Sequence, residues 1–252
     1  MISKSHLKHL VSLKQAKFRK EHEEFIVEGE KMVAELLNSR FRIKGVYGVA
    51  EWMQESASKF TNLIVEEISQ KDLERISSLK TPNKVLALVE IPTQEEIKSP
   101  TKGLHLILDT IQDPGNLGSI IRTADWFGIE NIYCSKDTVS LYNPKVIQST
   151  MGSFARVKVH YTELSDLLQQ NKALPVYGSL LDGEDIFKKK LDLNAFLIIG
   201  NESKGISKEV QTFIDQKVKI PSFAINKSDQ AESLNAALAT AILCAEFRKQ
   251  SI

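Results

Sequence analysis

The sequence predicts an α/β protein whose second half holds a mostly parallel sheet. Residues 104–108 form a short apolar run, which is typical of a strand buried on both faces. A helical pattern of apolar residues over 119–127 follows it, and a further apolar run begins at Asn131. Such a strand–helix–strand unit implies two parallel strands. A second buried run, residues 196–199, leads straight into Gly200 and extends the predicted sheet.

The chain divides into two predicted domains near residues 91–103. Its 252 residues are enough for two modest domains. Pro92, Pro100 and Gly103 interrupt a polar stretch there, and proline and glycine at this density break both helices and strands. We therefore expect one domain over residues 1–95 and a second over residues 103–252.

The first domain is predicted to be a small mixed α/β unit. Val33, Leu36 and Leu37 have the spacing of a helix face. Ser69 is a candidate N-cap, because a serine oxygen can accept a hydrogen bond from the first turn of a helix. The expected helices cover residues 5–12, 29–37 and 69–76, and the expected strands cover residues 42–49, 63–65 and 85–89.

The remaining elements of the second domain follow its apolar runs. The helix over residues 119–127 is expected to end at Gly128, because glycine adopts the left-handed conformation common after helices. Ser207 is expected to cap a helix that runs to residue 213, and a strand is expected at 217–220. A last helix over residues 233–248 has apolar residues three and four apart, and its alanines indicate close packing against another helix.

The composition is that of a globular protein with no membrane-spanning segment. The chain is 42% hydrophobic and 26% charged, as in an ordinary globular protein. No apolar run approaches the ~18 residues of a membrane span. No secretory signal is visible, so we expect a cytoplasmic protein. Cys134 and Cys244 lack the spacing of metal ligands, and we expect both to be buried with neither a disulfide nor a metal site.

Basic residues gather at the amino end, although the formal net charge of the whole chain is only +1. No acid occurs before Glu21. Such a segment can hold the phosphates of a nucleic acid, or it can be the solvated face of a helix, and charge alone favours neither. The six bases are Lys4, Lys8, Lys14, Lys17, Arg19 and Lys20.

Polar segments follow the predicted strands of the second domain, at the edge where parallel sheets bind ligands. In the first, Gly115 and Gly118 allow close approach of the backbone, and Asn116 offers both a donor and an acceptor. Arg122 is expected in the first turn of the following helix, near an amino end that favours phosphate. The alternative is a structural turn with Arg122 in a surface ion pair.

The second and third polar segments add further candidates. Gly200 and Gly205 have the spacing of a phosphate-binding loop, but Ile206 stands where that loop needs a lysine, and no dinucleotide-binding spacing occurs in either glycine-bearing segment. Glu202 can orient a polar ligand group, or belong to a structural helix-entry turn. Ser233 is expected to cap the last helix, with Asn235 presenting its amide outward from the first turn.

Together the three segments resemble the SpoU (TrmH) family of RNA ribose methyltransferases. The resemblance rests on residues 113–128, 198–207, 220–221 and 232–235, and the first domain is similar to the ribosomal-protein-like substrate-binding domain of many members. It implies a trefoil-knotted α/β methyltransferase domain, and homodimers with the site at the subunit interface. It also implies transfer of a methyl group from S-adenosylmethionine to the 2′-hydroxyl of a ribose in rRNA or tRNA.

The same resemblance implies roles for individual residues. Arg122 would stabilise the developing ribose oxyanion rather than take its proton, because a guanidinium stays protonated. Residues 222–231 form a longer, glycine-free link than family members commonly have. The alternatives are an inactive, dimeric RNA-binding protein of the same fold and a nucleotide-dependent dehydrogenase. The implied catalytic residues are Asn116, Arg122, Glu202, Ser233 and Asn235, and the implied cofactor-binding residues are Gly200, Ile220 and Leu234.

Overall fold

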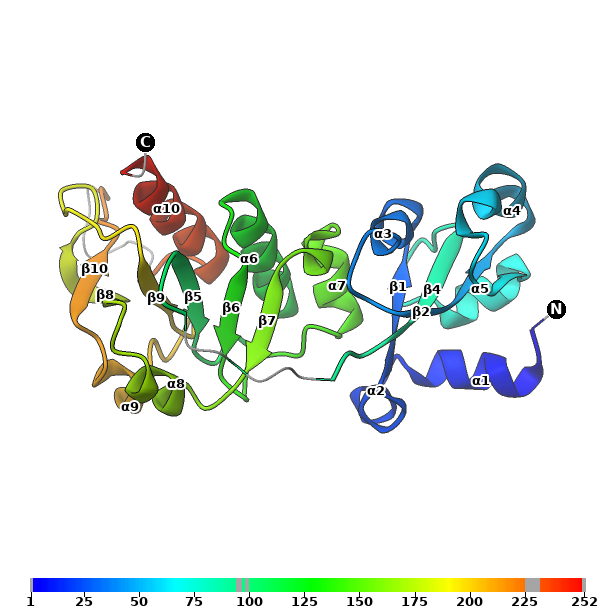
Figure 1. Cartoon of the computed structure of the whole chain (residues 1–252), viewed down its shortest axis with the longest axis horizontal. Helices are drawn as coiled ribbons and strands as arrows, with labels where there is room; N and C mark the ends of the chain where they lie inside the picture. The colour runs from blue at the N-terminus through cyan, green and yellow to red at the C-terminus, as the bar shows by residue number, and fades with distance from the viewer. Residues whose placement is uncertain (1, 94–96, 98–99, 225–231, 251–252) are drawn as a thin grey trace. The chain divides into compact units, whose positions relative to one another are not determined.

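A computed structural model describes residues 2–93, 97, 100–224 and 232–250 (Figure 1). The chain forms two compact units. The first comprises Met1–Gln94 together with Ser140–Arg156, and the second comprises Glu95–Val139 and Val157–Ile252. The segment Ser140–Arg156 belongs to the first unit although the sequence places it within the expected second domain. No helix of the described residues combines the length and apolar character needed to cross a membrane.

The first unit is built on a four-stranded mixed sheet with the order β1-β4-β2-β3. Strand β4 is antiparallel to both β1 and β2, and β2 is parallel to β3. The strands are β1 (Glu24–Glu28), β2 (Ile43–Gly48), β3 (Val65–Glu67) and β4 (Val85–Glu90). The helical elements are α1 (Lys4–Ser12), α2 (Ala16–His22), α3 (Glu30–Leu36), α4 (Ala50–Ser56), η1 (Ala57–Phe60), α5 (Gln70–Ile76), α7 (Pro144–Thr150) and η2 (Ser153–Ala155).

Two apolar layers stabilise this sheet. Leu10 on α1 and Leu73 on α5 share one core cluster with Leu86 on β4. Elsewhere in this unit Phe25 of β1 packs edge-on against Phe41 and, with ring centroids 6.5 Å apart, against Phe154 of η2. Burial of these large side chains supplies most of the driving force for folding of the unit.

The mixed α/β prediction for the first unit is confirmed, and Ser69 caps α5 by accepting a hydrogen bond of 3.1 Å from the Asp72 N–H. Strand β1 and the helical elements α2, α4, η1, α7 and η2 were not predicted from the sequence. Strand β1 was hidden because Glu24 and Glu28 are buried despite their charge. Each carboxylate is satisfied inside the fold, Glu28 by the hydroxyl of Ser77 for example. An acid at each end of a short run otherwise indicates a solvated segment.

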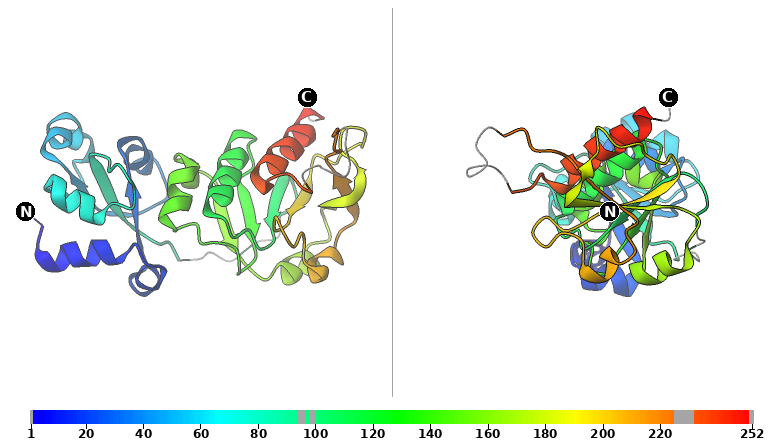
Figure 2. Two further views of the ribbon diagram at one scale, coloured as in Figure 1. Left: turned by 180° about the vertical axis from the view of Figure 1, so that it is seen from behind. Right: turned by 90° about the vertical axis from the view of Figure 1, so that its left-hand side faces the viewer.

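The second unit holds a six-stranded sheet in which every neighbouring pair is parallel, with the order β10-β8-β9-β5-β6-β7. This confirms the predicted parallel sheet. Helices α6 and α10 pack against each other over one face, and α8 and α9 lie on the other (Figure 1 and Figure 2). The strands are β5 (Leu104–Leu108), β6 (Asn131–Cys134), β7 (Lys158–Tyr161), β8 (Val176–Asp185), β9 (Ala195–Ile199) and β10 (Gln216–Lys219). The helices are α6 (Pro114–Trp126), α8 (Leu164–Gln170), α9 (Lys208–Gln211) and α10 (Ala236–Lys249).

The ends of three helices differ from prediction. Helix α6 begins at Pro114 rather than residue 119, because Asp113 caps it and Pro114 occupies its first turn. Arg122 therefore lies in the third turn and not the first. Helix α9 ends at Gln211, and the Ser207 side chain makes no capping hydrogen bond. Helix α10 is capped by Asn235 and not by Ser233.

Candidate functional site

The three polar segments meet beyond the carboxyl ends of the central strands. The side-chain N–H of Asn116 donates to the carboxylate of Glu202. The Asn235 amide in turn donates to Asn116 Oδ1 at 2.8 Å. Residues 86 and 119 positions apart are thus joined in one chain of hydrogen bonds. Because Glu202 can only accept when ionised, the orientation of each amide in the chain is determined by its partner.

Two helix ends supply the frame for this cluster. Asp113 Oδ1 accepts from the Asn116 N–H at 2.8 Å at the start of α6. Asn235 Oδ1 accepts from the N–H groups of Ala237 and Leu238 at the start of α10. The amino ends of both helices therefore lie at the cluster that holds Glu202, and their partial positive charge favours a negative group there.

A buried carboxylate beneath the cluster ties the first segment to the second. Asp109, which is 3% exposed, directly follows β5 and accepts from the Ser207 N–H at 2.7 Å and the Thr110 hydroxyl at 3.0 Å. Thr110 has a φ of 62°, a left-handed conformation that β-branched residues rarely adopt. The Thr110 carbonyl accepts from the side chain of Asn201 at 2.9 Å. These bonds hold the strained backbone in place.

The second segment closes on itself and presents Glu202 at its tip. Backbone bonds of 3.0 and 2.8 Å link Asn201 and Gly205 in both directions. Gly200 is required by this close approach, because a Cβ at that position would lie 2.3 Å from the carbonyl carbon of Gly205. Asn201 Oδ1 also accepts from the N–H groups of Ser203 and Lys204. Glu202 is thus carried by a loop with little conformational freedom.

A cavity of about 530 Å³ lies beside this loop. That volume is within the usual range for a site that binds a small molecule. Gly200, Ile220 and Leu234, the residues expected to bind the cofactor, all line it. Glu202 and Ser233 line it as well. Strand β8 contributes residues 179–182, which the sequence analysis did not single out.

Arg122 stands apart from the hydrogen-bonded cluster. It is exposed, and it makes no hydrogen bond or ion pair with any residue for which the structure gives a placement. Trp126, one turn further along α6, is 85% exposed, and Leu238 on α10 is 60% exposed. Asn116, Glu202 and Asn235 are therefore joined by hydrogen bonds, whereas Arg122 projects from an α6 surface that the described part of the chain leaves exposed.

The sequence analysis missed Asp109 and Asn201. A signal existed for each, since an acid directly follows the predicted buried strand 104–108 and an amide stands directly after Gly200. Residues 225–231 of the unusually long link lie outside the described residues. Within the described part of the chain, no three His, Cys, Asp or Glu side chains are grouped as metal ligands.

The chain matches two family models. Residues 103–245 match the SpoU rRNA Methylase family, and residues 4–87 match the MRM3-like substrate binding domain. The 23S rRNA (guanosine(2553)-2'-O)-methyltransferase RlmP of Bacillus subtilis is 30% identical over 89% of this chain and 88% of its own length.

Solved structures agree over nearly the whole chain. A putative RNA methyltransferase of the TrmH family from Porphyromonas gingivalis is 37% identical with a TM-score of 0.89, and the match covers 99% of each chain. The AdoMet-bound rRNA methyltransferase from Sinorhizobium meliloti is 27% identical with a TM-score of 0.87, covering 100% of this chain and 98% of that one. With three separated segments joined by hydrogen bonds beside one cavity, and a family match over more than half its length, the chain belongs to the SpoU rRNA methylase family.

Proposed function

We propose that this protein transfers a methyl group from S-adenosylmethionine to the 2′-hydroxyl of a ribose in ribosomal RNA. The observation that carries the proposal is the Asn235–Asn116–Glu202 chain of hydrogen bonds, which reaches the 530 Å³ cavity through Glu202. It joins the three segments that define the resemblance to the family. The names of the relatives support the same chemistry, and the substrate-binding match over residues 4–87 supports RNA as the substrate.

The cavity suits S-adenosylmethionine by its size and lining. Gly200, Ile220 and Leu234 would hold the adenosyl part against the backbone, and Leu180 and Ala236 add apolar surface. The cofactor supplies an electrophilic methyl group on a sulfonium. The Glu202 carboxylate lines the same cavity and would attract that cation.

The protein's own contribution to the reaction is positioning and charge. A ribose hydroxyl is a poor nucleophile until its proton leaves. Arg122 carries a permanent positive charge with no internal partner among the described residues, so its donors are available for the ribose oxygen and a neighbouring phosphate. Asn116, Ser233 and Asn235 would orient the ribose edge. Electrostatic stabilisation by such a preorganised donor is a large part of catalysis.

The proposal includes a homodimer. Trp126 and Leu238 are strongly exposed on α6 and α10, which pack together, and Ala245 adds a small, exposed side chain on α10. A second copy covering this surface would also enclose Arg122. The trefoil knot and the division into a substrate-binding domain over residues 1–95 and a catalytic domain over residues 103–252 belong to the same proposal and are supported by the family match. A cytoplasmic location is also part of the proposal.

The test is mass mapping of ribose methylation in ribosomal RNA from cells with and without the gene, paired with assays of the purified full chain. Loss of one methylated ribose without the gene is the expected result. The Arg122→Ala variant should bind S-adenosylmethionine normally by calorimetry, yet transfer methyl groups about 10²–10³ times more slowly. Identical RNA maps, with RNA binding intact, would instead identify an inactive RNA-binding protein.

A further inference from the structure

Four aromatic rings form a row on α1 and α2, in the first unit and outside the candidate catalytic site. Phe18 and His22 are nearly parallel, with centroids 6.3 Å apart and planes 12° apart. His22 meets His9 edge-on at 4.7 Å, and His9 lies 6.0 Å from His6. His22 is exposed, and the other three are half-buried. The row therefore offers ring surface to solvent from a supported position.

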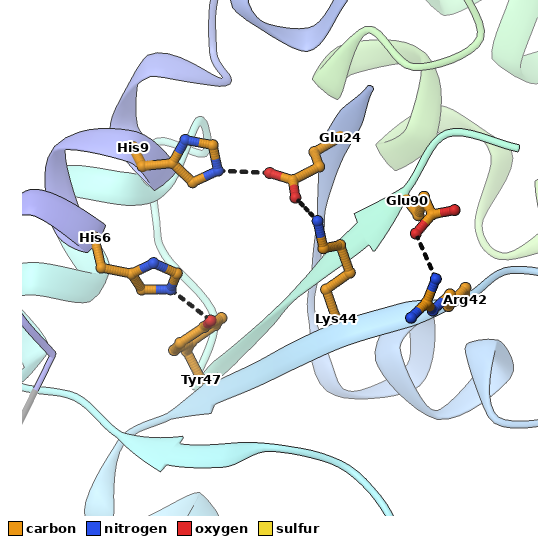
Figure 3. A network of polar contacts seen from close by, with 7 residues as sticks. All are labelled: His6, His9, Glu24, Arg42, Lys44, Tyr47 and Glu90. Atoms are coloured by element: carbon orange, nitrogen blue, oxygen red, sulfur yellow. Dashed lines mark hydrogen bonds and ion pairs between the residues drawn. The ribbon is translucent and has the colours of Figure 1, made fainter. Parts of the chain in front are cut away.

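The two histidine rings on α1, those of His6 and His9, are held by hydrogen bonds (Figure 3). His9 Nε2 lies 2.5 Å from Glu24 Oε2, and His6 Nε2 lies 2.6 Å from the Tyr47 hydroxyl. Each bond uses one ring nitrogen and fixes the tilt of the imidazole. The His9 side chain remains 26% exposed. Rings that are already ordered lose little entropy when a flat ligand stacks on them.

The acid beneath the row does not present an uncompensated negative charge. Burial by itself raises the pKa of Glu24, but hydrogen bonds from Lys44 and His9 outweigh it, so its pKa lies below the ordinary value. The carboxylate thus stays ionised and paired with Lys44 (Figure 3). An approaching phosphate would meet the compensated pair rather than a free acid.

Exposed lysines occur on the same two helices and on the turn between them. Lys8, Lys14, Lys17 and Lys20 are exposed, and the Lys17 ammonium lies 5.8 Å from the centre of the Phe18 ring. Arg19 is not part of this surface, although the sequence placed it among the six bases that could hold phosphates. It is buried and donates to the carbonyls of Leu13 and Lys14, so it fastens α2 to the end of α1. The rings and lysines are therefore presented by a fixed pair of helices.

We propose that Phe18, His22, His9 and His6 form a stacking surface for unpaired nucleotides of the RNA substrate, with Lys17 beside the Phe18 ring contacting its backbone. Proteins recognise single-stranded RNA by stacking bases on aromatic rings and tracking phosphates with basic side chains. Both features occur here together, because the rings lie on α1 and α2 and Lys17 lies over the Phe18 ring. The inference rests on the proposed function, since it takes RNA to be the substrate, and it adds which face of the first unit binds unpaired bases.

The experiment measures binding of fluorescein-labelled poly(A) to the full chain by anisotropy, with a duplex RNA of poly(A) and poly(U) as the second probe. Phe18→Ala and His22→Ala should each weaken poly(A) binding about 10- to 100-fold. His22→Phe keeps a ring and should stay within about twofold of the native affinity. Ile64→Ala removes an exposed apolar side chain elsewhere in the first unit and serves as the matched control. Duplex binding should change little in all four variants.

Unchanged poly(A) binding in Phe18→Ala and His22→Ala would overturn the proposal. So would a His22→Phe loss equal to that of His22→Ala, because the loss would then follow the imidazole rather than stacking. Thermal unfolding of each variant shows whether it is folded, and the comparison of His22→Ala with His22→Phe suffices if Phe18→Ala is not. S-adenosylmethionine binding should be normal in every variant. A native protein that binds poly(A) through these rings but methylates no RNA would defeat the proposed function alone.

Discussion

Replacing Asn116 by aspartate tests whether its amide joins the segments of the candidate site. In the native protein its Nδ2 donates to Glu202 and its Oδ1 accepts from Asn235. The substitution Asn116→Asp keeps the shape and the acceptor but replaces the donor by a carboxylate oxygen. Two carboxylate groups then face each other at hydrogen-bond distance with no proton between them.

The size of the effect follows from two terms. A hydrogen bond to a charged group contributes about 1.5–3 kcal/mol, and this is lost. Two like charges about 4 Å apart repel by about 4 kcal/mol at an effective dielectric constant of about 20. The two carboxylate groups can move apart, and one of them can take up a proton, so the actual loss is smaller than the sum of these two terms. We therefore expect the free energies of S-adenosylmethionine binding and of folding to become less favourable by about 3 kcal/mol in total. This corresponds to a factor of roughly 10² in the product of the two equilibrium constants.

The assay is calorimetric binding of S-adenosylmethionine with urea unfolding in parallel, at about pH 7.5 and about pH 5.5. The defect should shrink at the lower pH, because a proton on either carboxyl group restores a donor. Glu202→Gln is the matched partner, since its amide can donate to the new carboxylate. The double variant should recover about 2 kcal/mol relative to the sum of the single changes. Additive effects and a defect independent of pH would refute the contact.

Three further expectations concern groups outside the site. Arg19→Ala should lower the free energy of unfolding by about 2 kcal/mol in urea, since two carbonyls at the end of α1 lose a charged donor, while the exposed Lys20→Ala should change it by less than about 0.5 kcal/mol. Burial lowers the pKa of His105 despite a backbone hydrogen bond, so below about pH 6.5 this imidazole binds a proton more readily in the unfolded chain than in the folded one. The free energy of unfolding should therefore fall as the pH drops below about 6.5. The variant His105→Gln should show a weaker dependence of stability on pH. Burial raises the pKa of the Cys134 thiol and raises that of Cys244 to about 12, so neither should react with a disulfide reagent until the protein is unfolded, and a rapid native reaction would contradict the packing.

The convergence of the three segments was predictable from the sequence because of one geometric rule. Apolar runs at 104–108 and 196–199 indicated two strands of one mostly parallel sheet, whose carboxyl ends share an edge, and the structure makes them neighbours. Asn116 and Glu202 follow those strands and do meet. The rule does not extend to Arg122. Gly115 and Gly118 suggested a loop. Because Asp113 caps the helix and Pro114 fits its first turn, α6 instead begins at Pro114, five residues before the predicted start.

The residues that the sequence could not identify are those whose role depends on burial. Arg19 is one base among six in the sequence, and only the turn between α1 and α2 reveals that its guanidinium is used internally. Asp109 resembles an ordinary polar residue at a strand end. Its importance comes from the left-handed Thr110 beside it and the Ser207 N–H, which lies 98 positions away. Long-range pairing of this kind leaves no local pattern in a single sequence.

The use of asparagine at both junctions has a physical reason. Asn235 caps α10 through its oxygen and at the same time donates through its nitrogen to Asn116. Serine or aspartate would cap the helix as well, but neither could both accept from the backbone and offer a second, outward N–H. Asn116 likewise accepts from one neighbour and donates to the other. The helix ends fix the orientation of the two amides, and the Asn116 amide in turn fixes Glu202. The position of that carboxylate therefore depends on the folded ends of α6 and α10 and not on the loop alone.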